Sequence, residues 1–303
     1  MAKKKILVFI GICFFTSCSY LEVKMVRTLV EYPEHFPDES ESSLPELKTP
    51  YGDNTSKGNF VVSHGIKMYY EVYGQGFPLF LIHGNSSSSE DMKYQAEAFK
   101  DSFQVILVDS RAHGKSERGT SPLSYKLMAK DYIALAKHLQ IKHAHFLGWS
   151  DGANIALQVA TLQPALVKSI VAFAAVLSPD SMIKLFYEMT LLEYEAAKQE
   201  SQAEPSSEEK LTRKMQLELM SFFPKREQML KDLKKITTPV LVMVGEFDIV
   251  KLQETEKIAN LLQNSQLYIV PKGTHFAPYF KFQIINQKAK QFFTNSSTAA
   301  SRR

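Results

Sequence analysis

A serine with glycines two positions away on either side is the first feature that could do chemistry. The segment 148–152 reads GWSDG, follows an apolar run at 144–147 and precedes a helical pattern. A serine in a sharp strand-to-helix turn projects its hydroxyl above the sheet, and side chains two positions away would collide there. We therefore predict that Ser150 is a nucleophile and that Gly148 and Gly152 shape its turn. In the alternative interpretation, the Ser150 hydroxyl only caps the following helix.

A serine hydroxyl needs an imidazole to take its proton and a carboxylate to hold that imidazole in the right tautomer. With a serine on such a turn, the usual chain order is serine, acid, histidine. Of the eight histidines, only His275 follows Ser150. Asp248 comes shortly after the apolar run 239–244, so we expect it at the same sheet edge as the other two. Glu246 follows the same run and is the competing candidate for the acid.

Attack on a carbonyl group also needs donors for the negative charge that develops on its oxygen. The apolar run 77–82 is followed by His-Gly-Asn and then by four serines. We expect the backbone N–H groups of Asn85 and Asp151 to form this oxyanion hole, each stabilising the intermediate by about 3 kcal/mol. Ser86 is the alternative to Asn85.

Short runs rich in β-branched and aromatic residues alternate with helical patterns from residue 60 onward. This alternation predicts an α/β fold with a mostly parallel central sheet flanked by helices. The expected strands are 60–62, 66–73, 77–82, 104–108, 144–147, 167–177, 239–244 and 266–270. The expected helices of the core are 89–100, 126–139, 153–163, 254–262 and 283–293.

The stretch between the strands expected at 167–177 and 239–244 is charged and helical, without strand patterns. We interpret it as a helical cap inserted before the strand that carries the acid. From residue 59 the chain then consists of a first core segment at 59–178, the cap at 179–235, a second core segment at 236–295 and a disordered tail at 296–303.

The N-terminus has the pattern of an export signal over residues 1–18. Lysines at 3–5 precede an apolar stretch too short to span a bilayer comfortably, and the segment FTSC that ends at Cys18 resembles a bacterial lipobox. We therefore expect an exported protein of the bacterial cell envelope, held on the membrane by lipid at Cys18. The Glu-, Ser- and Pro-rich residues 19–58 form a polar tether in this interpretation. An uncleaved N-terminal anchor is the alternative.

Composition narrows the functional classes. The 303 residues are 45% hydrophobic, which suits a packed core, and the net charge of +4 comes without a basic stripe, so we expect no nucleic-acid partner. One of the two cysteines leaves with the signal and the other carries lipid, so no disulfide framework is expected. Phosphate-binding glycine loops are absent and no histidine or cysteine pair has ligand spacing, so we expect no cofactor and no metal.

Together these segments resemble the α/β-hydrolase fold family over about residues 60–293. The loop 109–116, with sequence DSRAHGKS, is similar to a structural loop of that family, although Ala112 stands where glycine is usual. The segment 148–157, with sequence GWSDGANIAL, looks like the small-ester branch, which includes valacyclovir-hydrolase-like and enol-lactonase-like enzymes. Relatives that open epoxides or remove halogens use aspartate where Ser150 stands.

The resemblance and the candidate residues imply a serine hydrolase that cleaves a small carboxylic ester through an acyl-enzyme. The same triad also serves thioesters, lactones and carbon–carbon bonds of diketone-like acids, so these substrates stay open. A lipoprotein that is catalytically idle and uses the fold to bind a ligand is the alternative of another class. The oligomeric state is not predicted.

Overall fold

The computed structural model describes residues 44–176, 178, 181–203, 208–221 and 226–298. The chain divides into two units, Met1–Glu46 and Leu47–Arg303. The expected signal segment, its Cys18 and the first part of the expected tether lie outside the described residues. The sheet, the helices and the candidate site all belong to the second unit.

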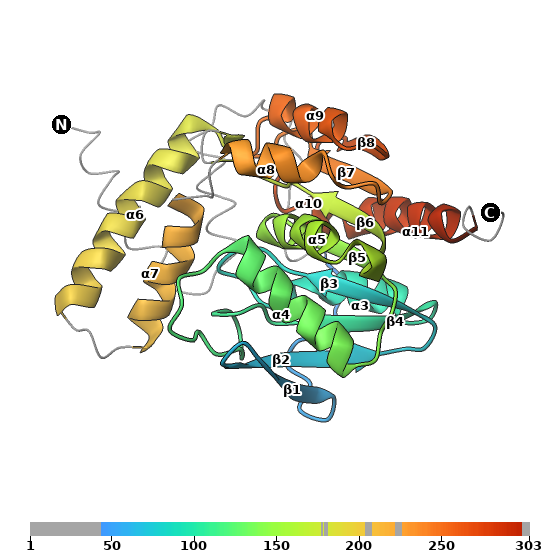
Figure 1. Cartoon of the computed structure of the whole chain (residues 1–303), viewed down its shortest axis with the longest axis horizontal. Coiled ribbons are helices and arrows are strands. Elements are labelled where there is room, and N and C mark those ends of the chain that lie inside the picture. The colour runs from blue at the N-terminus through green and yellow to red at the C-terminus, as the bar shows by residue number, and fades with distance from the viewer. Residues whose placement is uncertain (1–43, 177, 179–180, 204–207, 222–225, 299–303) are drawn as a thin grey trace. The chain divides into compact units, whose positions relative to one another are not determined.

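An eight-stranded sheet forms the centre of this unit, with strand order β1-β2-β4-β3-β5-β6-β7-β8 (Figure 1). Strands β1 and β2 pair antiparallel to their neighbours, and the pairs from β4 to β8 are all parallel. The strands are β1 Gly58–Ser63, β2 Ile66–Tyr73, β3 Phe77–Ile82, β4 Phe103–Val108, β5 Ala144–Trp149, β6 Val167–Phe173, β7 Val240–Gly245 and β8 Ser265–Val270. The predicted fold class, α/β with a mostly parallel sheet and flanking helices, is confirmed.

Helices cover both faces of the sheet. One core cluster joins one face to α4 Tyr125–His138, α5 Asp151–Leu162, α8 Arg226–Leu233 and α9 Leu252–Leu261. The other face carries α3 Lys93–Phe99 and α11 Phe282–Thr298, where the rings of Phe99, Phe103 and Phe293 pack edge to face. The short elements η2 Ser89–Met92, η3 Pro164–Leu166 and α10 Ala277–Phe280 complete the connections.

Two long helices of the insertion, α6 Lys184–Ala203 and α7 Glu208–Ser221, pack against each other and form the cap (Figure 1). The third helix, α8, instead contacts α5 and α9, and its Met229 and Leu233 belong to the core cluster. The cap boundary predicted at 179–235 therefore extends too far, because an apolar helical stripe has the same sequence pattern whether it packs on a cap or on a core.

Three other predicted boundaries differ from the structure. The strand expected to reach residue 177 ends at Phe173, because Ala174 turns with a φ of 52°. The expected tether ends earlier than residue 58, since Tyr51 is buried and the buried carboxylate of Glu71 accepts the N–H of Gly52 at 2.9 Å. Helix α11 continues to Thr298, three residues into the expected disordered tail, and 299–303 lie outside the described residues.

Candidate active site

The turn between β5 and α5 has the geometry of a nucleophile elbow. Ser150 has φ 56° and ψ −118°, and its N–H donates to the carbonyl of Phe173 at 2.8 Å. A Cβ on Gly148 would lie 2.2 Å from the carbonyl oxygen of Gly152, and one on Gly152 would lie 2.2 Å from that of Ile82. Both positions therefore require glycine. Within the described chain the Ser150 side chain makes no capping hydrogen bond to α5, so the interpretation of Ser150 as a helix cap is wrong.

Asp248 and His275 meet beyond the carboxyl ends of β7 and β8. Nδ1 of His275 lies 2.8 Å from Oδ1 of Asp248, whose side chain is fully buried and also accepts the N–H groups of Val250 and Gly245. A carboxylate only accepts, so Nδ1 carries the hydrogen and Nε2 keeps a free lone pair. That tautomer is the one a general base needs.

The competing acid, Glu246, lies elsewhere. Its Oε2 accepts the backbone N–H of Lys272 at 2.7 Å. This contact stabilises the turn after β8, in which Lys272 itself has a positive φ of 51°. Of the two carboxylates considered, Asp248 is the one hydrogen-bonded to His275.

The imidazole of His275 lies beside the elbow. Its ring centroid is 6.1 Å from that of Trp149, the residue before Ser150, and its side chain is 11% exposed. Among the described residues, no hydrogen bond joins the Ser150 hydroxyl to His275. Catalytic hydrogen bonds are often long in the absence of substrate and shorten in the reactive complex. The structure thus brings Asp248 and His275 into contact and places both at the sheet edge that carries Ser150.

The loop after β3 runs alongside the nucleophile. A Cβ on Gly84 would lie 3.4 Å from Cβ of Ser150, and Nδ2 of Asn85 donates to Oδ2 of Asp151 at 2.8 Å. Within the part of the chain that the structure describes, neither the N–H of Asn85 nor that of Asp151 donates to a protein acceptor. Both amides thus have no protein acceptor there, whereas the N–H of Ser150 is occupied by Phe173.

The side chain of Asp151 is buried and contacts this loop. Its Oδ1 accepts the hydroxyl of Tyr125 at 2.6 Å, and its Oδ2 accepts Nδ2 of Asn85. Burial raises the pKa of Asp151, against the lowering effect of the hydrogen bonds from Tyr125 and Asn85. The Asp151 carboxylate thus links the elbow to α4, through Tyr125, and to the loop after β3, through Asn85.

His83 fixes the start of the same loop. Its Nε2 accepts the backbone N–H of Ser110 at 3.0 Å, so Nδ1 carries the hydrogen and donates to the carbonyl of Gly84 at 2.7 Å. Burial lowers the pKa of His83, which keeps Nε2 unprotonated and able to accept. His83 is therefore a structural residue that links the loop after β3 to the loop after β4.

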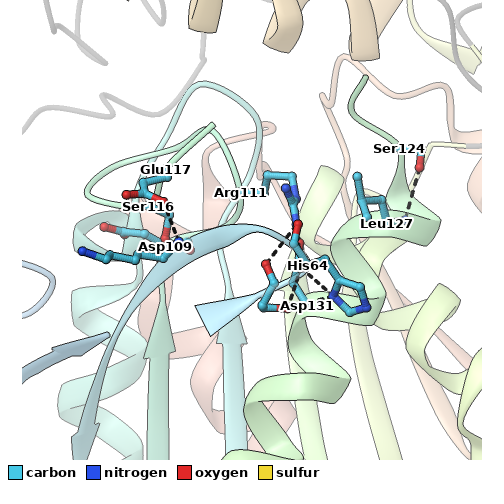
Figure 2. Close-up of polar contacts among 10 residues, drawn as sticks. His64, Asp109, Arg111, Ser116, Glu117, Ser124, Leu127 and Asp131 are labelled. Atoms are coloured by element: carbon cyan, nitrogen blue, oxygen red, sulfur yellow. Dashed lines mark hydrogen bonds and ion pairs between the residues drawn. The ribbon is translucent and has the colours of Figure 1, made fainter. Parts of the chain in front are cut away.

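The loop after β4 is held by hydrogen bonds, which agrees with its similarity to a structural loop of the family. Asp109 accepts the N–H groups of Ser89 and Lys115 at 2.8 Å each, and the Ser116 hydroxyl donates to the Asp109 carbonyl. Figure 2 shows this loop beside the buried Arg111–Asp131 ion pair. No group of three His, Cys, Asp or Glu side chains within the described residues is arranged to hold a metal ion.

Comparison with known proteins identifies the family. The family described as alpha/beta hydrolase fold matches residues 78–227. The chain belongs to the α/β-hydrolase family. The predicted family resemblance is confirmed, whereas the small-ester branch stays a prediction.

Individual relatives of this α/β hydrolase are distant. The uncharacterized hydrolase YugF of Bacillus subtilis is 25% identical over 264 residues, which cover 75% of this chain and 94% of that protein. A thermophilic esterase from Thermogutta terrifontis is 22% identical with a TM-score of 0.64, over 79% of this chain and 98% of that one. The enol-lactonase from Burkholderia xenovorans is 17% identical with a TM-score of 0.65, over 78% and 100%. The two solved structures establish the fold alone.

Sequence reasoning missed two residues of this hydrolase site, Tyr125 and Gln216, and the role of the Asn85 side chain. Tyr125 and the side chain of Asn85 hold Asp151, and Gln216 of α7 contacts the loop after β3. The serine-rich composition of that loop was the only signal nearby, and it indicated backbone donors rather than side-chain contacts.

The described helices include none long and apolar enough to cross a membrane.

Proposed function

We propose that the protein is a serine hydrolase that cleaves a small carboxylic ester through an acyl-enzyme. The observation that carries the proposal is the 2.8 Å contact between His275 Nδ1 and Asp248 Oδ1 beside a serine in a strained elbow. An imidazole oriented in this way is the group that activates a serine hydroxyl.

In the proposed reaction, Nε2 of His275 takes the Ser150 proton while Oγ attacks the ester carbonyl. The N–H groups of Asn85 and Asp151 donate to the oxyanion of the tetrahedral intermediate. Collapse breaks the bond to the alcohol, which leaves with the proton from His275. Water, deprotonated by the same imidazole, then attacks the acyl-enzyme. The bond from the acyl carbon to Oγ of Ser150 breaks as Oγ takes the proton from His275, and the acid leaves.

Thioesters, lactones and carbon–carbon bonds are alternative substrates for the same residues, and the small-ester branch is favoured by the segment 148–157. The two nearby solved structures, an esterase and an enol-lactonase, share only the fold with this chain. A substrate panel must therefore include a lactone and a thioester beside p-nitrophenyl esters.

Labelling with a fluorophosphonate probe tests the proposal. The full-length protein should be labelled, Ser150→Ala should not, and hydrolysis of short p-nitrophenyl esters should disappear in the same variant. Ser87→Ala, which changes another serine of the described chain, serves as the matched control and should be labelled like the wild type. A folded wild type that neither reacts with the probe nor hydrolyses any substrate would favour the ligand-binding alternative.

We further propose that the protein is exported and lipidated at Cys18. The support is the lysine-rich start, the short apolar stretch and the lipobox-like FTSC segment. Expression in a bacterium fed an alkyne-bearing fatty acid should give a labelled protein in the membrane fraction. Cys18→Ser should abolish the label, and a retained label or an unlabelled wild type would contradict lipidation at this residue.

A further inference from the structure

Gln216, on the cap helix α7, is almost fully buried and makes three contacts with two loops of the core. Its Nε2 donates to the carbonyl of Ala112 at 2.5 Å, its Oε1 accepts the hydroxyl of Ser86 at 3.3 Å, and its backbone carbonyl accepts Nδ2 of Asn85 at 3.1 Å. One residue of the cap thus contacts Asn85 and Ser86 of the loop after β3 and also Ala112 of the loop after β4.

Two of these contacts are made with residues whose backbone is strained, through the Ser86 hydroxyl and the Ala112 carbonyl. Ser86 has a φ of 54° and Ala112 a φ of 61°, in the left-handed region that side chains other than glycine rarely adopt. Such conformations persist only where the surroundings hold them. Gln216 contacts both residues, since its Nε2 donates to the Ala112 carbonyl and its Oε1 accepts the Ser86 hydroxyl.

Asn85 is held between the cap and the core. One Nδ2 hydrogen points to Oδ2 of Asp151, the other points to the carbonyl of Gln216, and Oδ1 accepts the Ser86 hydroxyl. Tyr125 anchors Asp151 in turn. The chain of contacts Tyr125, Asp151, Asn85 and Gln216 therefore joins the two residues whose N–H groups are the proposed oxyanion donors, and it ends on α7.

We propose that Gln216 is a positioning residue for the oxyanion hole. It holds the Asn85 N–H in place only while α7 lies against the core, so that the seating of the cap sets the rate of the chemical step. This inference rests on the proposed hydrolase function. Donors contribute to catalysis only when they are fixed where the oxyanion forms, so a loosened Asn85 loop lowers kcat more than it weakens substrate binding.

The test compares full-length wild type with Gln216→Met, which keeps the approximate size of the side chain and removes its two side-chain hydrogen bonds, to Ala112 and Ser86, while the backbone carbonyl still accepts Nδ2 of Asn85. We expect kcat for p-nitrophenyl acetate to fall about tenfold while KM changes by less than about twofold. Affinity for phenylboronic acid, whose serine adduct imitates the tetrahedral intermediate, should fall in parallel. A role confined to stability would leave the affinity of the folded protein for the boronic acid unchanged.

Glu208→Gln is the matched control, because Glu208 joins the other end of α7 to Arg118 through an exposed ion pair. It should keep kcat and boronate affinity near the wild type. An equal loss in both variants would overturn the specific role of Gln216, and so would an unchanged kcat or a change confined to KM. A wild type without hydrolase activity would instead overturn the proposed function, and this inference with it.

Gln216→Glu covers the case in which the methionine variant does not fold. The carboxylate keeps an acceptor for Ser86 but loses the donor to the Ala112 carbonyl. The kcat of Gln216→Glu should be lower than that of the wild type at neutral pH. The ratio of the variant's kcat to that of the wild type should rise in acid, where the protonated carboxyl can donate again. A ratio that stays constant with pH would contradict the proposal.

Discussion

The imidazole of His275 and the carboxylate of Asp248 are in contact at 2.8 Å, although the residues are 27 positions apart in the chain. Each is placed by its own strand, β7 for the aspartate and β8 for the histidine, and the two strands pair in parallel. The aspartate is further held by the N–H groups of Val250 and Gly245. Its orientation is thus fixed before any substrate binds.

Replacing Asp248 by asparagine should lower kcat by about a thousandfold or more. The amide would present its N–H to Nδ1 and favour the tautomer with hydrogen on Nε2, which cannot accept the Ser150 proton. The measurement is kcat on p-nitrophenyl acetate, with circular dichroism to show that the fold is kept. Glu246→Gln should stay near wild type, because an amide oxygen can still accept the N–H of Lys272. Comparable losses in the two variants would contradict the assignment of Asp248.

The strained backbone at Ser150 should be visible as a stability difference between two inactive variants. Because φ is 56° there, Ser150→Gly relieves a strain that Ser150→Ala retains, and we expect the glycine variant to have a free energy of unfolding about 1 kcal/mol higher. Urea unfolding of both variants measures this difference in the free energy of unfolding. At Ser169, inside β6, the order should be reversed, since glycine weakens a strand. Equal stabilities at position 150 would argue against strain.

Much of this arrangement follows from local sequence rules. The elbow is local, because strand, glycine spacing and helix lie within a few residues, and the order of Ser150, Asp248 and His275 follows from the family pattern. Alternating strands and helices likewise predict the parallel sheet. The overlong strand at 167–177 shows the limit, since Ala175 and Val176 are buried and apolar without being part of a strand.

The polar contacts around the site could not be predicted in the same way. Asn85 forms hydrogen bonds with Asp151, 66 positions away in the sequence, and with Gln216, 131 positions away. Hydrogen bonds between such distant residues produce no periodic pattern in the sequence. Glu71 likewise accepts the N–H of Gly52 from a segment whose composition resembles a tether. Composition predicts whether a segment can form a core, whereas these contacts depend on which loops the fold brings together.

The buried ion pair of Arg111 and Asp131 should show strong coupling (Figure 2). Nε and Nη2 of Arg111 each lie 2.8 Å from an oxygen of Asp131, and both side chains are closed to solvent. Removing either partner leaves a buried charge, so Arg111→Met and Asp131→Leu should each lower the free energy of unfolding by about 3–5 kcal/mol. The double variant should lose less than the sum.

Urea unfolding of the wild type, the two single variants and the double variant completes this cycle. The exposed pair of Arg118 and Glu208 is the control and should show little coupling, because solvent screens it. Losses that add within about 0.5 kcal/mol at Arg111 and Asp131 would show that the ion pair is not the source of the effect.

Acid sensitivity of the fold should come in part from His145. This side chain is buried on β5 against the rings of Phe77 and Phe293, and its Nδ1 lies 2.7 Å from Oγ of Ser169. Burial, assisted by the charge of Lys168, lowers the pKa of His145 from 6.5 to about 4. Between these two pH values the unfolded chain binds a proton that the folded protein does not.

The sign of the effect follows from this difference in proton binding. The contribution of His145 to stability is complete above the pH at which the unfolded histidine titrates, and it is lost as the pH falls toward about 4. The free energy of unfolding lost through His145 approaches about 1.4 kcal/mol per pH unit.

The variant His145→Gln, which can still hydrogen-bond Ser169, should make the dependence of unfolding free energy on pH shallower by about that amount. Ser169→Ala removes the same hydrogen bond without removing the histidine, so it should lower stability and keep the slope. If urea titrations at several pH values gave His145→Gln the slope of the wild type, the acid sensitivity would have to come from other groups, such as His83 and His113, whose pKa values burial also lowers.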